Sequence, residues 1–349
     1  MTLSDLQRFD VANMYEAVLG FADQLKQGRA LARQARLAQW PGTDVTGLVV
    51  CGMGGSALGG DVLRMLASDH AQIPVAVARS YSLPSWVGEN TAVIASSYSG
   101  NTEETLAVLD QALERGARVL TVTTGGAMGD RASAQDLDLV PLPSGLQPRA
   151  ALAFSLAALV TVCERLDLTN VQESDWAEAS AIVRAQAEEL CDPGAPANLA
   201  VAMAYAMHGR TPVIYSSEQL EAANVRWRNQ LHENAKTFAV GNLLPEMNHN
   251  EIMGWSRFGA ELKNLAVVTL RDREDHPRTQ HRLDVTQSLL APHAGSWHVV
   301  HSTGKSRLAR LLSLMYVSDW VSLYLAILNE VDPSPVGLIA KLKKALADG

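Results

Sequence analysis

The chain has 349 residues, a formal net charge of -8, and 47% hydrophobic and 19% charged residues. At roughly 150 residues per domain, this length predicts about two domains with a large buried core, and the composition excludes global disorder. The acidic balance argues against a non-specific nucleic-acid binder, which needs a basic surface. The cysteines Cys51, Cys163 and Cys191 form no CxxC pair, so we predict reduced thiols in a cytoplasmic protein.

No membrane segment is expected. The N-terminus carries Asp5 and Asp10 and lacks the apolar core of a signal peptide. Residues 311–328 are apolar enough to span a bilayer, but Asp319 stands in their middle, where a charge is costly. We therefore predict a buried helix there, and neither a membrane nor a nucleic acid as a partner.

The first half alternates short apolar runs with helical patterns. Residues 1–40 predict helices, and another helix is expected after Gly100. This alternation is typical of βαβ units and a mainly parallel sheet. The strands predicted here are Gly47–Cys51, Ile73–Ala78, Thr91–Ser96, Ala117–Thr123 and Leu137–Leu142.

The second half repeats the rhythm. Its predicted strands are Pro212–Tyr215, Phe238–Val240, Leu265–Leu270 and Trp297–His301, and its helices lie over about 217–235, about 306–329 and after Pro335. The segment Cys191–Pro196, rich in proline and glycine, is the best linker candidate. The chain is thus predicted to be an α/β protein, with a helical segment at 1–40, a first domain at 41–165, a connecting segment at 166–196 and a second domain at 197–349.

A glycine-rich loop, Gly52–Asp61, follows the first predicted strand. Glycines let the backbone approach an anion, and the next helix offers free N–H groups. The loop lacks a P-loop lysine, which argues against nucleotide hydrolysis. An NAD site needs an acidic residue about 20 positions on, where the chain has Arg79 and Ser80, so NADP stays open as a ligand. A tight turn without a ligand is the other alternative.

A hydroxyl-rich loop, Ser96–Thr105, follows the third predicted strand. Hydroxyls and free amides at a helix N-terminus bind a phosphate monoester without a metal, whereas a single hydroxyl would indicate an ordinary helix cap. The segment Thr123–Gly126 after the fourth strand is interpreted as a turn. The candidate phosphate-binding residues of the two loops are Gly54, Gly55, Ser56, Ser97, Ser99 and Thr102.

The sequences Gly-Met-Gly-Gly-Ser and Ser-Tyr-Ser-Gly-Asn-Thr resemble the sugar isomerase (SIS) domain, a module that binds phosphosugars. Two later segments, Arg226–Lys236 and Pro245–Trp255, make the chain similar to the bifunctional phosphoglucose/phosphomannose isomerase family, and Gln147–Ala151, Asp319–Val321 and Val331–Val336 fit the same family. The resemblance runs from about residue 45 to the C-terminus. It implies two doubly wound, flavodoxin-like SIS domains with mainly parallel sheets.

The resemblance also implies an activity. Members of this family interconvert glucose 6-phosphate or mannose 6-phosphate with fructose 6-phosphate through a cis-enediol, an intramolecular oxidoreduction for which we expect no cofactor and no metal. One carboxylate can move the proton between carbons 1 and 2. Glu233 matches the family's catalytic glutamate, whereas its residue type alone would suggest a solvated helix end.

Three further roles follow from the same resemblance. Arg149 is expected to stabilise the enediolate, although an arginine at the mouth of a buried helix can be structural. His249 is expected to open the sugar ring, with Lys343 as its helper. Lys341 and Lys344 lie near Lys343, so a solvated lysine-rich face is the alternative for that residue.

In this family the histidine comes from the neighbouring subunit, so the resemblance implies a homodimer with a shared active site. One departure is visible, because the family commonly has asparagine where this chain has His232, beside Glu233. Two other function classes stay open: a non-catalytic sugar-phosphate-binding SIS protein, and an NADP-dependent oxidoreductase that uses Gly52–Gly60 and Arg79.

Overall fold

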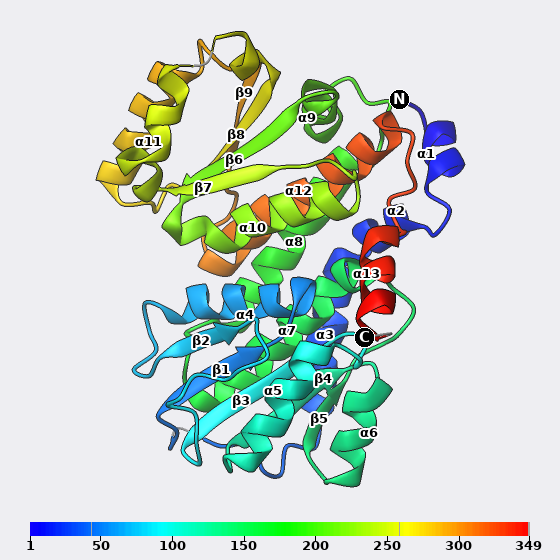
Figure 1. Cartoon of the computed structure of the whole chain (residues 1–349), viewed down its shortest axis with the longest axis vertical. Coiled ribbons are helices and arrows are strands. Elements are labelled where there is room, and N and C mark those ends of the chain that lie inside the picture. The colour runs from blue at the N-terminus through cyan, green and yellow to red at the C-terminus, as the bar shows by residue number, and fades with distance from the viewer. Residues whose placement is uncertain (43, 258, 348–349) are drawn as a thin grey trace. The chain divides into compact units, whose positions relative to one another are not determined.

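The computed structural model describes residues 1–42, 44–257 and 259–347, and the chain forms two compact units. The five-stranded unit comprises Gly20–Arg184 and Gly304–Leu311. The four-stranded unit comprises Met1–Leu19, Ala185–Thr303 and Leu312–Gly349. The chain therefore leaves the four-stranded unit after its first helices and returns to it twice (Figure 1).

The five-stranded unit is built on a fully parallel sheet in the order β2-β1-β3-β4-β5. This is the strand order of flavodoxin-like doubly wound folds, so the predicted fold class is confirmed. All five predicted strands are present, with small shifts at their ends. They are β1 (Gly47–Cys51), β2 (Val75–Ala78), β3 (Thr91–Ser97), β4 (Arg118–Thr123) and β5 (Asp138–Pro141).

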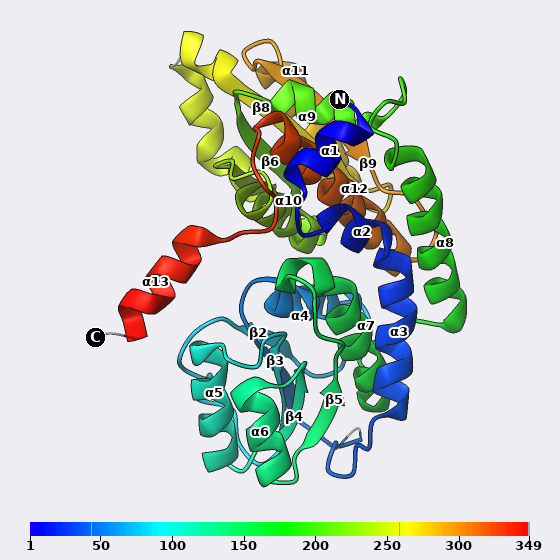
Figure 2. The same cartoon turned by 90° about the vertical axis from the view of Figure 1, so that its right-hand side faces the viewer.

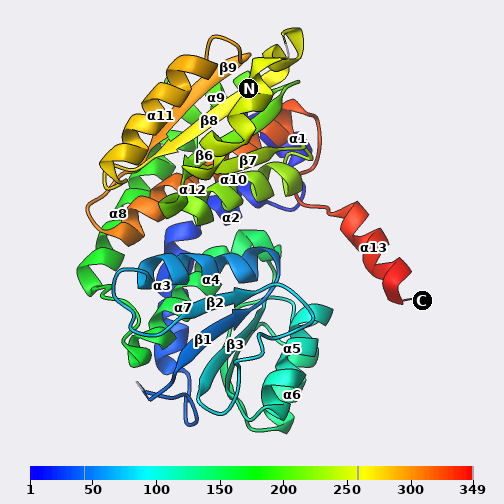
Figure 3. The same cartoon turned by 60° about the vertical axis from the view of Figure 1, so that its left-hand side comes forward.

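Helices cover both faces of this sheet (Figure 3). Alternate strand residues point to opposite faces, so Val49, Val93 and Val119 form one core with α5 and α6. The other face packs against α4 and α7, and α3 packs on α7. The helices of this unit are α3 (Phe21–Gln34), α4 (Gly54–Ala67), α5 (Glu103–Glu114), α6 (Gly126–Ala134) and α7 (Leu152–Cys163), which the 3-10 turn Pro148–Ala151 precedes.

The four-stranded unit has a second parallel sheet in the order β7-β6-β8-β9. Val213, Tyr215 and Val267 form a core with Leu283 and Leu290 of α11 on one face. On the other face, Asn224 of α10 donates to the carbonyl oxygen of Ile214 at 2.9 Å. The strands are β6 (Thr211–Ser217), β7 (Val240–Leu244), β8 (Leu265–Arg271) and β9 (Ser296–His301), and the helices are α1 (Leu3–Phe9), α2 (Met14–Leu19), α9 (Leu199–Met207), α10 (Glu221–Glu233), α11 (Pro277–Leu290), α12 (Arg307–Leu328) and α13 (Gly337–Ala347).

One strand prediction was wrong. Residues 238–240 were expected to form a strand, but β7 begins only at Val240, where it pairs with Val213 of β6. Phe238 is 72% exposed and stacks on the ring of His232, and the backbone of Ala239 bonds to the same ring, so these two residues form the approach to the strand. A helix of 18 residues, α8 (Glu173–Leu190), also lies in the predicted connecting segment, where none was expected.

The first helices pack against the last long one. Asp10 accepts from the amides of Met14 and Tyr15, both at 2.7 Å, and so fixes the start of α2. The ring of Tyr15 meets Trp320 of α12 edge to face at a centroid distance of 5.3 Å. Residues 1–19 thus belong to the same compact unit as the C-terminal half of the chain.

The apolar helix α12 lies in the core. Among the described residues it is the one helix long and apolar enough to cross a membrane, and 94% of that window is buried inside the protein. Asp319 in its middle accepts from Nε and Nη2 of Arg226, both at 2.8 Å, and from Gln230 at 2.9 Å. A charge buried in this way needs a partner, and Arg226 supplies it.

The three cysteines differ in accessibility, and this predicts their reactivity. Cys51 and Cys163 are completely buried, whereas Cys191 is partly exposed. Burial raises the pKa of Cys51 to about 12 and that of Cys163 still further, so neither forms the reactive thiolate near neutral pH. We expect a thiol reagent such as DTNB to modify one cysteine in the folded protein and all three after denaturation. Rapid reaction of more than one thiol in the folded protein would contradict this burial.

Candidate active site

The order of the five-stranded sheet places a crevice at the carboxyl ends of β1 and β3. After β1 the chain continues to β2 on one side of it, and after β3 it continues to β4 on the opposite side. Doubly wound folds bind ligands where the strand order reverses in this way. The loop after β1 leads into α4, which begins at Gly54 with a φ of +51°, a conformation that favours glycine. The first-turn amides of a helix lack acceptors within the helix, so α4 offers N–H groups at the crevice.

The hydroxyl-rich loop after β3 lies at the same crevice. Ser97 is buried, and its Oγ lies 2.8 Å from Oγ1 of Thr102 and accepts from the amide of Gly100 at 3.1 Å. Ser99 is exposed and accepts from the amide of Asn101 at 3.3 Å. Thr102 precedes the first residue of α5, yet its side chain makes no capping hydrogen bond. Thr102, and not Ser99, is thus the N-cap residue of α5, and its side chain does not cap the helix.

Tyr98, which the sequence analysis did not single out, joins the loops of the crevice. Its amide donates to Oγ of Ser56 at 3.2 Å, and its carbonyl oxygen accepts from Oγ1 of Thr124 at 2.8 Å. Its hydroxyl donates to the carbonyl oxygen of Pro143 and accepts from the amide of Leu146. The only sequence signal for this role is the position of Tyr98 between the two serines of the motif.

Arg149 lies beside the glycine-rich loop. A Cβ placed on Gly55 would lie 3.1 Å from the carbonyl oxygen of Pro148 and 3.5 Å from Cα of Arg149, so the two backbones touch. The Arg149 residue is 3% exposed. The five-stranded unit thus brings Gly54, Gly55 and Ser56 and the Ser97–Thr102 loop, which are predicted to bind phosphate, close to the backbone of Arg149, which is predicted to stabilise the enediolate.

Arg79 has a partner that bears on the NADP alternative. Its guanidinium forms an ion pair with Asp61 of α4, whose side chain is 7% exposed. A 2'-phosphate would have to compete with this internal carboxylate for the arginine. The pairing therefore argues against NADP in the glycine-rich loop.

The corresponding crevice of the four-stranded sheet is acidic. Ser217 at the end of β6 donates its hydroxyl to Asp275, which follows β8 and is 2% exposed. Asp272 lies next to it and is also buried, and burial raises the pKa of Asp275 above its usual value. A second phosphate is disfavoured here, because its charge would meet two buried carboxyl groups.

Glu233, the last residue of α10, lines a cavity of about 580 Å³. One wall is the end of α10 and the turn after it, including Lys236 and Phe238, and the other is the start of α13 with Leu338 and Lys341. A carboxylate at the negative end of a helix dipole is electrostatically unfavourable. The position of Glu233 in α10 therefore does not itself stabilise the helix.

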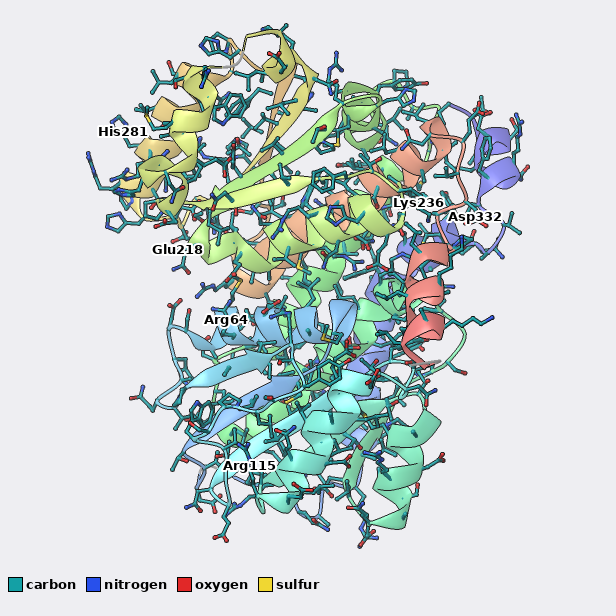
Figure 4. The ribbon with its side chains drawn as sticks, viewed as in Figure 1. Arg64, Arg115, Glu218, Lys236, His281 and Asp332 are labelled. Carbon is teal, nitrogen blue, oxygen red and sulfur yellow. The ribbon has the colours of Figure 1, made fainter. Side chains whose placement is uncertain are left out.

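Lys236 fixes the turn after Glu233. Its Nζ donates to the carbonyl oxygen of Glu233 at 2.6 Å and to that of Pro333 at 2.9 Å. Figure 4 shows Lys236 at this end of α10, near Asp332 in the segment that leads to α13. The lysine thus links the end of α10 to the segment before α13, a role that the sequence did not reveal because one partner is the carbonyl group of Pro333, 97 residues away.

His232 is held by the backbone of Ala239. Its Nε2 accepts from the amide of Ala239 at 3.1 Å when the proton is on Nδ1, and the carbonyl oxygen of Ala239 lies 2.9 Å from the same nitrogen. Each tautomer thus finds a partner in one residue. His232, for which the family resemblance implied an asparagine, therefore orders the turn before β7.

His249 is exposed and lies at the end of a 3-10 turn, Glu246–His249. The segment after it is fixed by Glu251, which accepts from the hydroxyl of Tyr215 and, at 2.8 Å, from Asn242. The indole of Trp255 donates to the same hydroxyl at 3.1 Å. His249 is not among the described residues that line the Glu233 cavity.

The lysines of α13 differ in position. Lys341 lines the Glu233 cavity, whereas Lys343 is an exposed residue of the same helix outside that lining. Within the described parts of the chain, no group of three or more His, Cys, Asp or Glu residues is arranged to hold a metal ion.

Comparisons with known proteins match both halves of the chain. The family model "SIS domain" matches residues 44–138, and "Bacterial phospho-glucose isomerase C-terminal SIS domain" matches residues 197–346. The bifunctional phosphoglucose/phosphomannose isomerase of Caldicellulosiruptor bescii is 39% identical, over 96% of this chain and 99% of its own, and that of Aquifex aeolicus is 34% identical, over 95% and 98%.

A solved structure supports the fold alone. A hypothetical protein from Thermus thermophilus has a TM-score of 0.69 at 18% identity, and the match covers 95% of this chain and 91% of the other. Because the two relatives above exceed 30% identity over nearly their whole length, the chain belongs to the bifunctional phosphoglucose/phosphomannose isomerase family.

Proposed function

We propose that this protein interconverts glucose 6-phosphate and mannose 6-phosphate with fructose 6-phosphate. The observation that carries the proposal is the crevice of the five-stranded sheet, in which a helix N-terminus, the Ser97–Thr102 loop and the backbone of Arg149 meet. The names of the two relatives give the same activity. The substrate class is thus a phosphorylated hexose.

The phosphate is held by the two loops of the crevice. Ser56, Ser97, Ser99 and Thr102 supply hydroxyl donors, and the start of α4 supplies backbone amides. These groups stabilise a dianion without a metal, because charge-assisted hydrogen bonds are about twice as strong as neutral ones. The phosphate then anchors the substrate while carbons 1 and 2 react.

Glu233 is the base. In this role it removes the proton from one of the two carbons and returns it to the other through a cis-enediol, so no net proton is consumed. Arg149 stabilises the negative charge that develops on the enediolate oxygens. The unfavourable place of Glu233 at the negative end of α10 supports the assignment of the base.

His249 opens the sugar ring, with Lys343 as its helper, and it acts in the partner subunit of a homodimer. Its exposed position outside the cavity that Glu233 lines supports a role in another chain. Lys341 is the alternative helper, since it lines the cavity. Exchange of subunits between an E233Q homodimer and an H249A homodimer should restore part of the activity, whereas two sites complete within single chains would stay inactive.

A coupled turnover assay tests the activity itself. Fructose 6-phosphate is supplied to the purified protein in EDTA, and glucose 6-phosphate and mannose 6-phosphate are measured separately. Formation of both products supports the proposal. Binding of fructose 6-phosphate without either product would instead assign a sugar-phosphate sensor.

The phosphate loop gives a separate prediction. We expect Ser97→Ala to raise KM for fructose 6-phosphate about 10- to 100-fold, because about 1.5–3 kcal/mol is lost with one charge-assisted hydrogen bond. The inhibition constant of inorganic phosphate should rise by a similar factor. The control is Ser133→Ala, since Ser133 is an exposed residue at the end of α6 whose hydroxyl bonds to Gly129. An unchanged KM in S97A would remove Ser97 from the phosphate site.

A further inference from the structure

A second cavity, of about 540 Å³, lies within the five-stranded unit, away from the crevice of its sheet. It is a groove between α3 and the first part of α8, two helices that run side by side in Figure 2. Its lining comprises Ala22, Leu25, Lys26, Arg29, Ala30, Arg33, Gln34, Glu173, Trp176, Ala177, Ser180 and Arg184. None of these residues belongs to the candidate active site.

The groove is built from one face of each helix. On α3, Lys26, Arg29 and Arg33 recur at intervals of three or four residues, and on α8, Glu173 and Arg184 stand three turns apart on one face. Four lining residues are basic and one is acidic. In a chain with a net charge of -8, such a concentration of positive charge is a local exception.

Three arginines of the groove are paired with only two carboxylates. One oxygen of Glu173 accepts from Nη2 of Arg29 at 2.5 Å and also from Arg33. Arg184 binds Asp23 at 2.5 Å, at the edge of the groove. The Glu173 side chain is 68% exposed, so its hold on the two guanidiniums is open to solvent and to competing anions.

An aromatic residue, Trp176, lines the groove, and two N–H groups there have no hydrogen-bond acceptor among the described residues. Trp176 is 2% exposed, and the guanidinium carbon of Arg29 lies 4.6 Å from its ring centroid, which orients the arginine. Nε of Arg29 and Nε1 of Trp176 have no hydrogen-bond partner among the described residues. Buried donors without partners are rare and call for an explanation, such as a bound ion.

We propose that this groove is a binding site for a small organic oxyanion with two or more negative charges, either phosphoryl or carboxylate. The groove has three guanidiniums, those of Arg29, Arg33 and Arg184, and a guanidinium binds phosphoryl and carboxylate groups through paired N–H donors. The volume exceeds what an inorganic ion fills, and the exposed residues Ala30 and Ala177 offer apolar surface to a carbon body. In the unliganded protein Glu173 occupies the place of the ligand's charge.

This arrangement gives opposite predictions for two neighbouring residues. Arg33→Gln removes a donor, so binding should weaken about fivefold or more, as expected for one charge-assisted contact. Glu173→Gln removes the competing carboxylate, so binding should tighten about fivefold. Both side chains are about half exposed or more, so both variants are expected to fold. The matched control is Arg131→Gln, which breaks the exposed pair of Arg131 with Asp110 in the same unit.

The test is calorimetric titration of the full-length protein with inorganic pyrophosphate and, separately, with citrate. Each titration is run with and without fructose 6-phosphate at a concentration that saturates turnover, because this compound occupies the candidate active site but is itself a phosphoryl oxyanion of the proposed class. Tryptophan fluorescence follows the same titrations, and Trp176→Phe should remove the signal change. Binding of pyrophosphate alone indicates a phosphoryl ligand, binding of citrate alone indicates a polycarboxylate, and binding of both indicates a general oxyanion site.

Two results would overturn the proposal. One is the absence of heat and fluorescence change with both anions at millimolar concentration. The other is an equal change of affinity in R33Q, E173Q and R131Q, which indicates non-specific attraction to the surface. Opposite shifts in R33Q and E173Q, with R131Q unchanged, support the groove as the site.

Discussion

Glu233→Gln is expected to lower kcat about 10²–10⁴-fold for both aldose products, the range measured when a positioned general base is lost. Glutamine keeps the size and hydrogen-bonding shape of the side chain but cannot take a proton. KM for fructose 6-phosphate should stay within about threefold, because the phosphate contacts lie on other residues. A loss confined to kcat is the signature of a group that acts in the transition state.

The same variant gives a second measurement, which is independent of product formation. In D2O the wild-type enzyme should exchange the carbon-bound proton of its substrate, and E233Q should not. Glu189→Gln is the matched control, because Glu189 is an exposed glutamate of α8 in the same unit. Wild-type turnover in E233Q would refute the assignment of the base, whereas loss of activity in E189Q would point to a general effect on the fold.

Asp319→Asn is expected to destabilise the four-stranded unit by about 3–5 kcal/mol, because it leaves Arg226 charged and buried without its counter-ion. The two side chains are each 2% exposed, so water cannot replace the missing charge. Urea unfolding followed by tryptophan fluorescence measures the change, since Trp227 and Trp320 lie on the two helices that carry the pair. The expected result is a lower unfolding midpoint with little change in slope.

Two further variants separate the pairing from other effects. The exposed pair Asp110–Arg131 provides a control, and Asp110→Asn should cost at most about 1 kcal/mol. The double variant R226M/D319N should be less destabilised than the sum of its two single variants, because neither charge is then left alone. Additive losses in this cycle would show that the two side chains do not interact.

Much of the fold was predictable from the sequence, because buried parallel strands are short apolar runs. Gly47–Cys51 and Leu265–Leu270 were found in this way, within one residue at each end. The strand at Val240–Leu244 was misplaced because Gly241 and Asn242 interrupt its apolar pattern. Phe238, which is exposed, is an aromatic residue of the kind enriched in strands, and it moved the prediction toward the N-terminus. The helix α8 was missed because its charged and apolar residues follow no sharp helical stripe.

The candidate site was predictable where it consists of a loop and not where it depends on long-range contacts. The motif with Ser97 and Thr102 is contiguous in sequence, and the structure places both hydroxyls 2.8 Å apart. Arg149 was found through a family motif, but its backbone contact with Gly55 comes from packing. The links that Tyr98 and Lys236 make go to backbone groups, which have no sequence signature.

The division of the chain also sets an order for its synthesis. Helices α1 and α2 leave the ribosome before the five-stranded unit, yet Trp320, the ring on which Tyr15 packs, follows about 300 residues later. Most of the five-stranded unit is one continuous segment, Gly20–Arg184, so this unit can begin to fold while the rest of the chain is synthesised. Until α12 has been synthesised, α1 and α2 cannot pack against it, and Leu6 and Met14, which are buried in the folded protein, stay exposed. A gene fragment that starts at residue 197 would lack them, so the two halves are not expected to be separable as expression products.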